Sequence, residues 1–191
     1  MSRFDPQSYG PVVAALLDGA PLNELGPGEP NTRAYAALKA LTPESLAASA
    51  VLHDRQMALA CIAALWLRHD YADQSHGISQ SLDMLEGSYW HGILHRREPD
   101  FGNARYWMRR VGTHAIYGPL LAGARQLTAE AKPASAAAFL LEQTVWDPGR
   151  FIDLCEDALD DSPPLHTLVK RIQGLEWELL FDHCFGLAVG T

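Results

Sequence analysis

Residues 162–185, SPPLHTLVKRIQGLEWELLFDHCF, carry the clearest structural pattern in the chain. A serine followed by two prolines is typical of a helix start, because the hydroxyl can cap free backbone N–H groups and proline fits the first turn. Apolar residues then recur at spacings of three and four, which places them on one side of a helix: Leu165, Leu168, Ile172, Leu175 and Leu179. The segment therefore predicts a long helix, ending at about Phe185, with one face in a hydrophobic core.

The rest of the chain has the composition of a helical protein. Its 191 residues include 27 Ala and 27 Leu but only 7 Val and 6 Ile. Ala and Leu favour helices, whereas strands use β-branched residues. We therefore predict an all-α fold, with residues 1–191 as a single domain. Prolines make residues 1–31 rich in loops, and a bundle of about eight or nine helices should follow.

Capping residues and prolines predict where the helices begin and end. Thr42-Pro43 and Asp147-Pro148 repeat the pattern of a cap followed by proline. The polar stretch 69–77, HDYADQSHG, predicts a connector, and an interruption is expected near His53-Asp54. Lys132-Pro133 should separate a short helix. The other helices are expected at about 12–18, 31–41, 42–68, 79–98, 103–111 (capped by Asn103), 114–131 and 147–160.

The net charge and the length of the apolar runs argue against nucleic-acid and membrane partners. Fifteen Lys and Arg against 23 Asp and Glu give a net charge of −8, which disfavours a general nucleic-acid binder. The longest apolar run, Met57 to Leu67, is too short to cross a bilayer. The N-terminal MSRFDPQSYG lacks the pattern of a secretory signal, and three scattered Cys do not form a disulfide framework. We expect a cytoplasmic protein without nucleic-acid or membrane partners, and the sequence leaves a homo-oligomer open.

Residues 86–112, EGSYWHGILHRREPDFGNARYWMRRVG, contain a candidate metal site. On a helix, His91, His95 and Glu98 fall on consecutive turns as H-x-x-x-H-x-x-E. Two imidazoles and a carboxylate can ligate one ion, so a divalent transition metal is the candidate cofactor. Further ligands would come from His53, His69, His76, His114 or His183. The alternative is that the two histidines lie on a solvated polar face or are hydrogen-bonded in the core.

The arginines of the same segment predict an anion-binding surface. Arginines four residues apart project from adjacent turns, and their forked donors suit carboxylate or phosphate. The predicted ligand-binding residues are Arg96, Arg97, Asn103, Arg105, Tyr106, Arg109 and Arg110. The alternative is internal pairing, because residues 86–112 carry a net charge of +2 and residues 142–182 carry −7. The leading hypothesis is a protein that binds an anionic small molecule or a metal here, and the sequence leaves open whether it is an enzyme.

The same segment resembles one tetratricopeptide unit. Gly92 matches the small residue where the two helices cross, Phe101 the aromatic after the turn, and Ala104 the small packing residue. Val111 and Pro99 replace the usual Ala and Gly, and no second copy follows at the family's repeat period. The resemblance implies a helical hairpin, and it makes a non-enzymatic protein-interaction module the alternative function.

Two longer strings also resemble a known group of proteins. YWHGILHRREPDFGNARYW and LEWELLFDHC are similar to uncharacterised bacterial helical proteins. This resemblance supports the all-α prediction and implies no activity.

Overall fold

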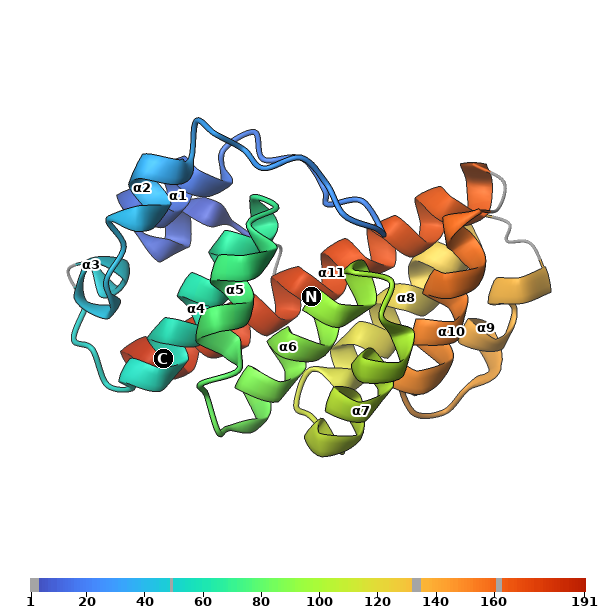
Figure 1. Cartoon of the computed structure of the whole chain (residues 1–191). Coiled ribbons are helices and arrows are strands. Elements are labelled where there is room, and N and C mark those ends of the chain that lie inside the picture. Colours follow the sequence, from blue (N-terminus) through green and yellow to red (C-terminus); the bar gives the residue numbers. More distant parts are fainter. Residues whose placement is uncertain (1–3, 49, 132–134, 161–162) are drawn as a thin grey trace.

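The computed structural model describes residues 4–48, 50–131, 135–160 and 163–191 (Figure 1). Within these ranges the chain forms helices and no strands, which confirms the all-α prediction. Eight of the α-helices have seven or more residues, close to the number expected. The elements are η1 Pro6–Tyr9, α1 Pro11–Leu17, α2 Tyr35–Lys39, α3 Pro43–Ala47, α4 Arg55–Arg68, α5 Ala72–Ser79, α6 Leu85–Arg97, α7 Phe101–Val111, α8 Tyr117–Ala131, η2 Ser135–Ala137, α9 Phe139–Glu142, α10 Pro148–Leu159 and α11 Pro163–Val189.

Helix α11 runs along most of the molecule and packs against α4, α8 and α10 (Figure 1). Leu165, Leu168 and Ile172 of its predicted apolar stripe are buried, while Leu175 and Leu179 are half-buried at the edge of the core. Complete burial of such a side chain contributes about 1.5–3 kcal/mol to the free energy of folding, so this stripe is a major part of the core. The helix continues beyond Phe185 to Val189. Its predicted cap, Ser162, lies outside the described residues.

Two predicted capping residues, Thr42 and Asp147, act as expected, and a third cap begins the helix that follows the predicted interruption. The Thr42 hydroxyl accepts a hydrogen bond from the Ser45 N–H at the start of α3. Asp54 caps α4, which confirms the interruption expected near His53-Asp54. Asp147 accepts from two backbone N–H groups at the start of α10. Local side-chain chemistry therefore sets these boundaries, as the sequence predicted.

Two predicted boundaries around α5 are wrong. The polar stretch 69–77 is mostly helical and forms much of α5, and α6 begins at Leu85 instead of residue 79. Ser75 and Ser79 are fully buried, because small side chains let α5 pack closely against its neighbours. Tertiary packing outweighs the weak helix propensity of a polar segment. The predicted separator Lys132-Pro133 lies outside the described ranges.

Helices α6 and α7 form an antiparallel hairpin with the most extensive contact between any two helices of the described chain. A Cβ added at Gly92 would stand only 3.0 Å from the Met108 Cε atom, so the glycine permits the close approach of α7. Ala104 is fully buried in the same interface. The hairpin is present, and its relation to the tetratricopeptide family stays a prediction. None of the helices in the described ranges is long and apolar enough to cross a membrane.

Candidate metal centre

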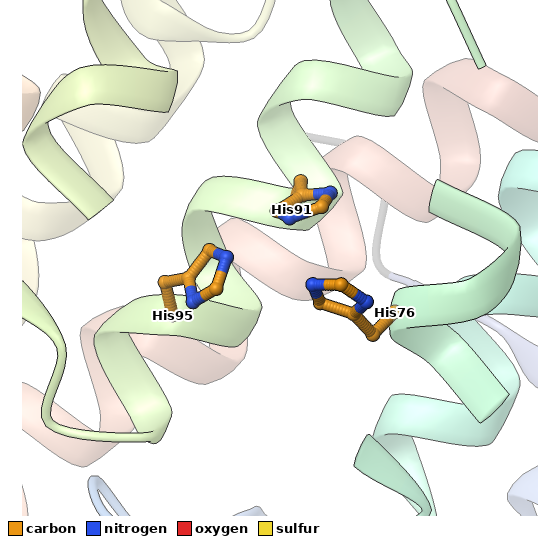
Figure 2. Close-up of side chains that lie close together, drawn as sticks. All are labelled: His76, His91 and His95. Carbon is orange, nitrogen blue, oxygen red and sulfur yellow. The ribbon is translucent and has the colours of Figure 1, made fainter. Parts of the chain in front are cut away.

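Three histidine side chains meet between α5 and α6. His76 projects from α5, and His91 and His95 project from successive turns of α6 (Figure 2). One nitrogen of each imidazole lies within 4.8 Å of the corresponding nitrogens of the other two. His91 and His95 are buried and His76 is half-buried. Of the two alternatives to a metal site, the solvated polar face is therefore wrong for His91 and His95, whereas hydrogen-bonded histidines in the core agree with their burial. The cluster reaches the surface through His76.

The rings of the cluster pack directly on one another and on an aromatic side chain of α7. The His91 ring centroid lies 4.5 Å from that of His76 and 4.7 Å from that of His95. Trp107 stacks on His91 with the ring centroids 4.2 Å apart. These contacts hold His91 from both sides, so the hairpin between α6 and α7 positions the centre of the cluster.

The environment of His91 and His95 favours their neutral form. Burial, together with the nearby His95 and His76, lowers the pKa of His91 to about 4, because an apolar environment and neighbouring positive charges both disfavour the protonated ring. Burial also lowers the pKa of His95. A metal ion binds the neutral form of imidazole, which has a free lone pair on one nitrogen. At neutral pH the His91 ring is therefore neutral, which is the form of imidazole that can ligate a metal ion.

Hydrogen-bonding groups surround the outer edges of the two rings on α6. The Ser79 hydroxyl lies 3.5 Å from Nδ1 of His91. On His95, the Glu98 carboxylate lies 3.1 Å from Nδ1 and the Asn103 amide nitrogen lies 3.1 Å from Nε2. A carboxylate beside Nδ1 favours the proton on that nitrogen and leaves the lone pair on Nε2. This lone pair accepts a hydrogen bond from the Asn103 amide, so an ion bound at Nε2 would have to displace Asn103.

Two predicted site residues thus have other roles than expected. Glu98 is not one of the three groups that converge, because it stands at the C-terminal end of α6 beside His95. Asn103 does not cap α7, since Asp100 accepts the Asn103 backbone N–H. The Asn103 side chain instead contacts His95. Glu98 and Asn103 both contact His95. The sequence had predicted Glu98 as a metal ligand and Asn103 as an anion-binding residue.

Arg96 lies in the core and pairs with an acid of the C-terminal region. Its guanidinium donates to the Glu176 carboxylate on α11, and both side chains are almost completely buried. Tyr89 donates to the other oxygen of that carboxylate at 3.0 Å. The Arg96 guanidinium also lies over the Phe151 ring, 4.8 Å from its centroid. These contacts favour internal pairing over ligand capture for Arg96.

Arg97 is also committed to contacts within the protein. It donates to the Asp70 carboxylate and to the backbone carbonyl groups of Glu24, Gly26 and Leu67. These acceptors lie in the N-terminal segment and at the end of α4. Arg97 therefore ties the long N-terminal loop to α6.

The other arginines and Tyr106 lie nearer the surface. Arg105 pairs with Asp153 and Glu156 on α10, and both acids are more than half exposed. This agrees with the pairing alternative, although the pair lies at the surface and not in the core. Tyr106, Arg109 and Arg110 are exposed. Of these, Arg110 lies over the Trp107 ring, 5.3 Å from its centroid.

No family model, curated protein or solved structure matches this chain.

Sequence reasoning named His76 only as one of five histidines that could complete a metal site. It could not choose among them, because the stretch around His76 was expected to be a connector. The spacing of Ala72, Ser75 and Ser79, three and four residues apart, is the signal for a helix with a small-residue face. On that helix His76 stands next to Ser75 and within reach of α6.

Proposed function

We propose that the protein binds a divalent transition-metal ion between His76, His91 and His95. The observation that carries the proposal is the convergence of three imidazole nitrogens within 4.8 Å of one another. Ligand nitrogens around one tetrahedral ion stand about 3.4 Å apart when the bonds are about 2.1 Å long. To reach that arrangement the three rings would have to move toward a common point.

The donor set restricts the kind of ion. Imidazole suits Zn²⁺, Fe²⁺, Ni²⁺ and Cu²⁺, whereas Mg²⁺ and Ca²⁺ prefer oxygen ligands. Glu98 beside His95 supplies a negative charge close to the ligands, which offsets part of the charge of the ion. Three protein ligands leave a coordination position open to water or to an exogenous ligand, as in catalytic zinc sites.

The ligand at the open position is best matched by a small anion. Arg110 lies over Trp107, and Trp107 stacks on His91, so an exposed cation stands one aromatic ring away from the cluster. A metal ion and a guanidinium both attract carboxylate or phosphate groups. Of the five arginines predicted to bind an anion, Arg110 is the one connected to the cluster, through the Trp107 ring. We therefore assign the anion-binding role to Arg110.

Metal titration of the purified protein tests the first part of the proposal. The protein is stripped with a chelator, carries no histidine tag, and is titrated with Zn²⁺ by calorimetry and with Co²⁺ by visible absorption. His76→Gln and His91→Ala should each bind one equivalent fewer than the wild type. His166→Gln is the matched control, because His166 is half-buried on α11 and lies outside the cluster. Equal uptake by all four proteins would contradict the proposal.

Thermal melts with anions test the second part. Phosphate or citrate should stabilise the Zn²⁺-loaded protein more than the stripped protein, since a ligand that binds only the folded state raises its stability. Arg110→Ala should remove this difference. Arg150→Ala is the control, because Arg150 also stacks on an aromatic ring but does so on α10, over Phe139. A stabilisation by anions that is independent of the metal or unchanged in Arg110→Ala would refute an anion site at the metal.

A further inference from the structure

A second group of metal-ligating side chains lies on another side of α6. Glu86 is in the first turn of this helix, five residues before His91, and therefore points about 140° away from it around the axis. There Glu86 meets His114, which precedes α8, and His183 of α11. These three groups come from segments that are distant in the sequence, so the fold brings them together.

The two histidine nitrogens converge on one carboxylate oxygen. Nε2 of His183 lies 3.1 Å from Oε1 of Glu86, and Nε2 of His114 lies 3.6 Å from the same oxygen. Neighbouring ligand atoms around one tetrahedral ion with bonds of about 2.1 Å are about 3.4 Å apart. The two distances lie on either side of that value. The shorter one is a hydrogen bond in which Nε2 of His183 donates its proton to Glu86, so a bound ion would take the place of this proton.

His114 adds an independent sign that a ligand belongs here. Its side chain is only 2% exposed. Its Nε2 atom forms no hydrogen bond of normal length within the described part of the chain, because the Glu86 oxygen that it faces is 3.6 Å away. A buried polar atom without a partner costs free energy, and such atoms are rare in folded proteins. An ion bound to Nε2 would remove that cost.

We propose that Glu86, His114 and His183 form a second, independent site for a divalent transition ion. Two imidazoles and one carboxylate suit Fe²⁺, Mn²⁺ or Zn²⁺, and they leave coordination positions open. This site differs from the three-histidine cluster because it supplies a negatively charged ligand directly. It also links α6 to α11 and to the segment between α7 and α8, so ion binding would stabilise the contacts among all three.

The surroundings of His183 give this site a path to solvent. The ring is 25% exposed, and His183 lines a cavity of about 710 Å³ together with Tyr9, Asp182 and residues at the C-terminal end of α11. The polar lining side chains include Gln7, Ser8 and Thr191. Because His183 contacts Glu86 and also borders the cavity, an ion can enter from this side, and water or a small polar molecule can approach it.

The test uses a protein in which the three-histidine cluster has been removed. The stripped His91→Ala variant is titrated with Zn²⁺, and the same titration is made on His91→Ala/His183→Gln and on His91→Ala/His166→Gln. His183 and His166 both lie on α11 and both are partly exposed, so the two double variants are matched. We expect one tight equivalent in the single variant and in the control. The variant lacking His183 should bind at least tenfold more weakly.

The outcomes separate the two proposed sites. If only the second site exists, wild type and His91→Ala bind one equivalent and His183→Gln binds none. If only the three-histidine cluster exists, His91→Ala binds none, and the second site is overturned. Glu86→Gln in the His91→Ala background is a second test of the site, because this substitution keeps the size of the side chain and removes its charge. Circular dichroism of each variant establishes that it is folded, and equal affinity in the two double variants would also overturn the second site.

Discussion

The two sides of helix α6 meet the surrounding protein in different ways. On the side facing α11 and the N-terminal loop, Arg96 and Arg97 each form an ion pair with an acid of another segment. On the side facing α5, His91 and His95 pack against His76 and are held neutral by burial. The first side therefore contributes to stability with its charges. The second brings together neutral imidazoles, the form of histidine that can ligate a metal ion.

Removal of Arg96 should have the largest effect on stability. Arg96→Ala leaves Glu176 buried without its positive partner, and breaking such a pair costs about 3–5 kcal/mol. Denaturant-induced unfolding measures the loss of free energy. The double variant Arg96→Met/Glu176→Gln should recover part of it, because no buried charge remains. A loss below about 1 kcal/mol in Arg96→Ala would show that the pair does not hold α6 to α11.

Acid should destabilise the metal-free protein through protonation of His91, on the side of α6 that faces α5. His91 has a pKa of about 4 in the folded state and about 6.5 when unfolded, so the unfolded chain binds the additional proton first as the pH falls. Stability should therefore be retained above pH 6.5 and decrease by about 2 kcal/mol between pH 6.5 and 4. Chemical unfolding at a series of pH values measures this slope. His91→Phe cannot take up the proton, and an unchanged slope in this variant would contradict the assignment.

Removal of Arg105 should have the smallest effect. Its partners Asp153 and Glu156 are more than half exposed, and an exposed pair contributes less than about 1 kcal/mol. The free energy of unfolding of Arg105→Ala should therefore lie within about 1 kcal/mol of the wild-type value, and the difference should diminish in high salt. Comparison with Arg96→Ala by the same method ranks the two pairs. A loss of similar size at both positions would remove the distinction between core and surface arginines.

The sequence predicted those features that depend on neighbours along the chain. The all-α class follows from composition, and the caps Thr42 and Asp147 act on backbone groups two or three residues away. The placement of His91 and His95 on adjacent turns also follows from helix geometry alone. Each of these predictions needs only the residue composition or the spacing of residues that are close in the sequence.

The remaining features depend on contacts between distant segments. His76 joins the cluster only because α5 packs against α6, and the small buried Ser75 and Ser79 that permit this packing look like a polar connector in the sequence. Arg96 and Arg105 were equivalent as sequence positions, yet one pairs in the core and the other at the surface. The unequal charge of residues 86–112 and 142–182 predicted that pairing could occur. It could not identify which arginine each acid would meet.

The most direct test of the three-histidine site is a crystal of the chelator-treated protein soaked in Zn²⁺ and measured at the zinc absorption edge. We predict an anomalous peak between His76, His91 and His95, about 2.0–2.1 Å from one nitrogen of each ring. The peak should be absent in crystals of His91→Ala grown and soaked in the same way. Full occupancy of zinc elsewhere on the protein, with no peak between these three rings, would contradict the account.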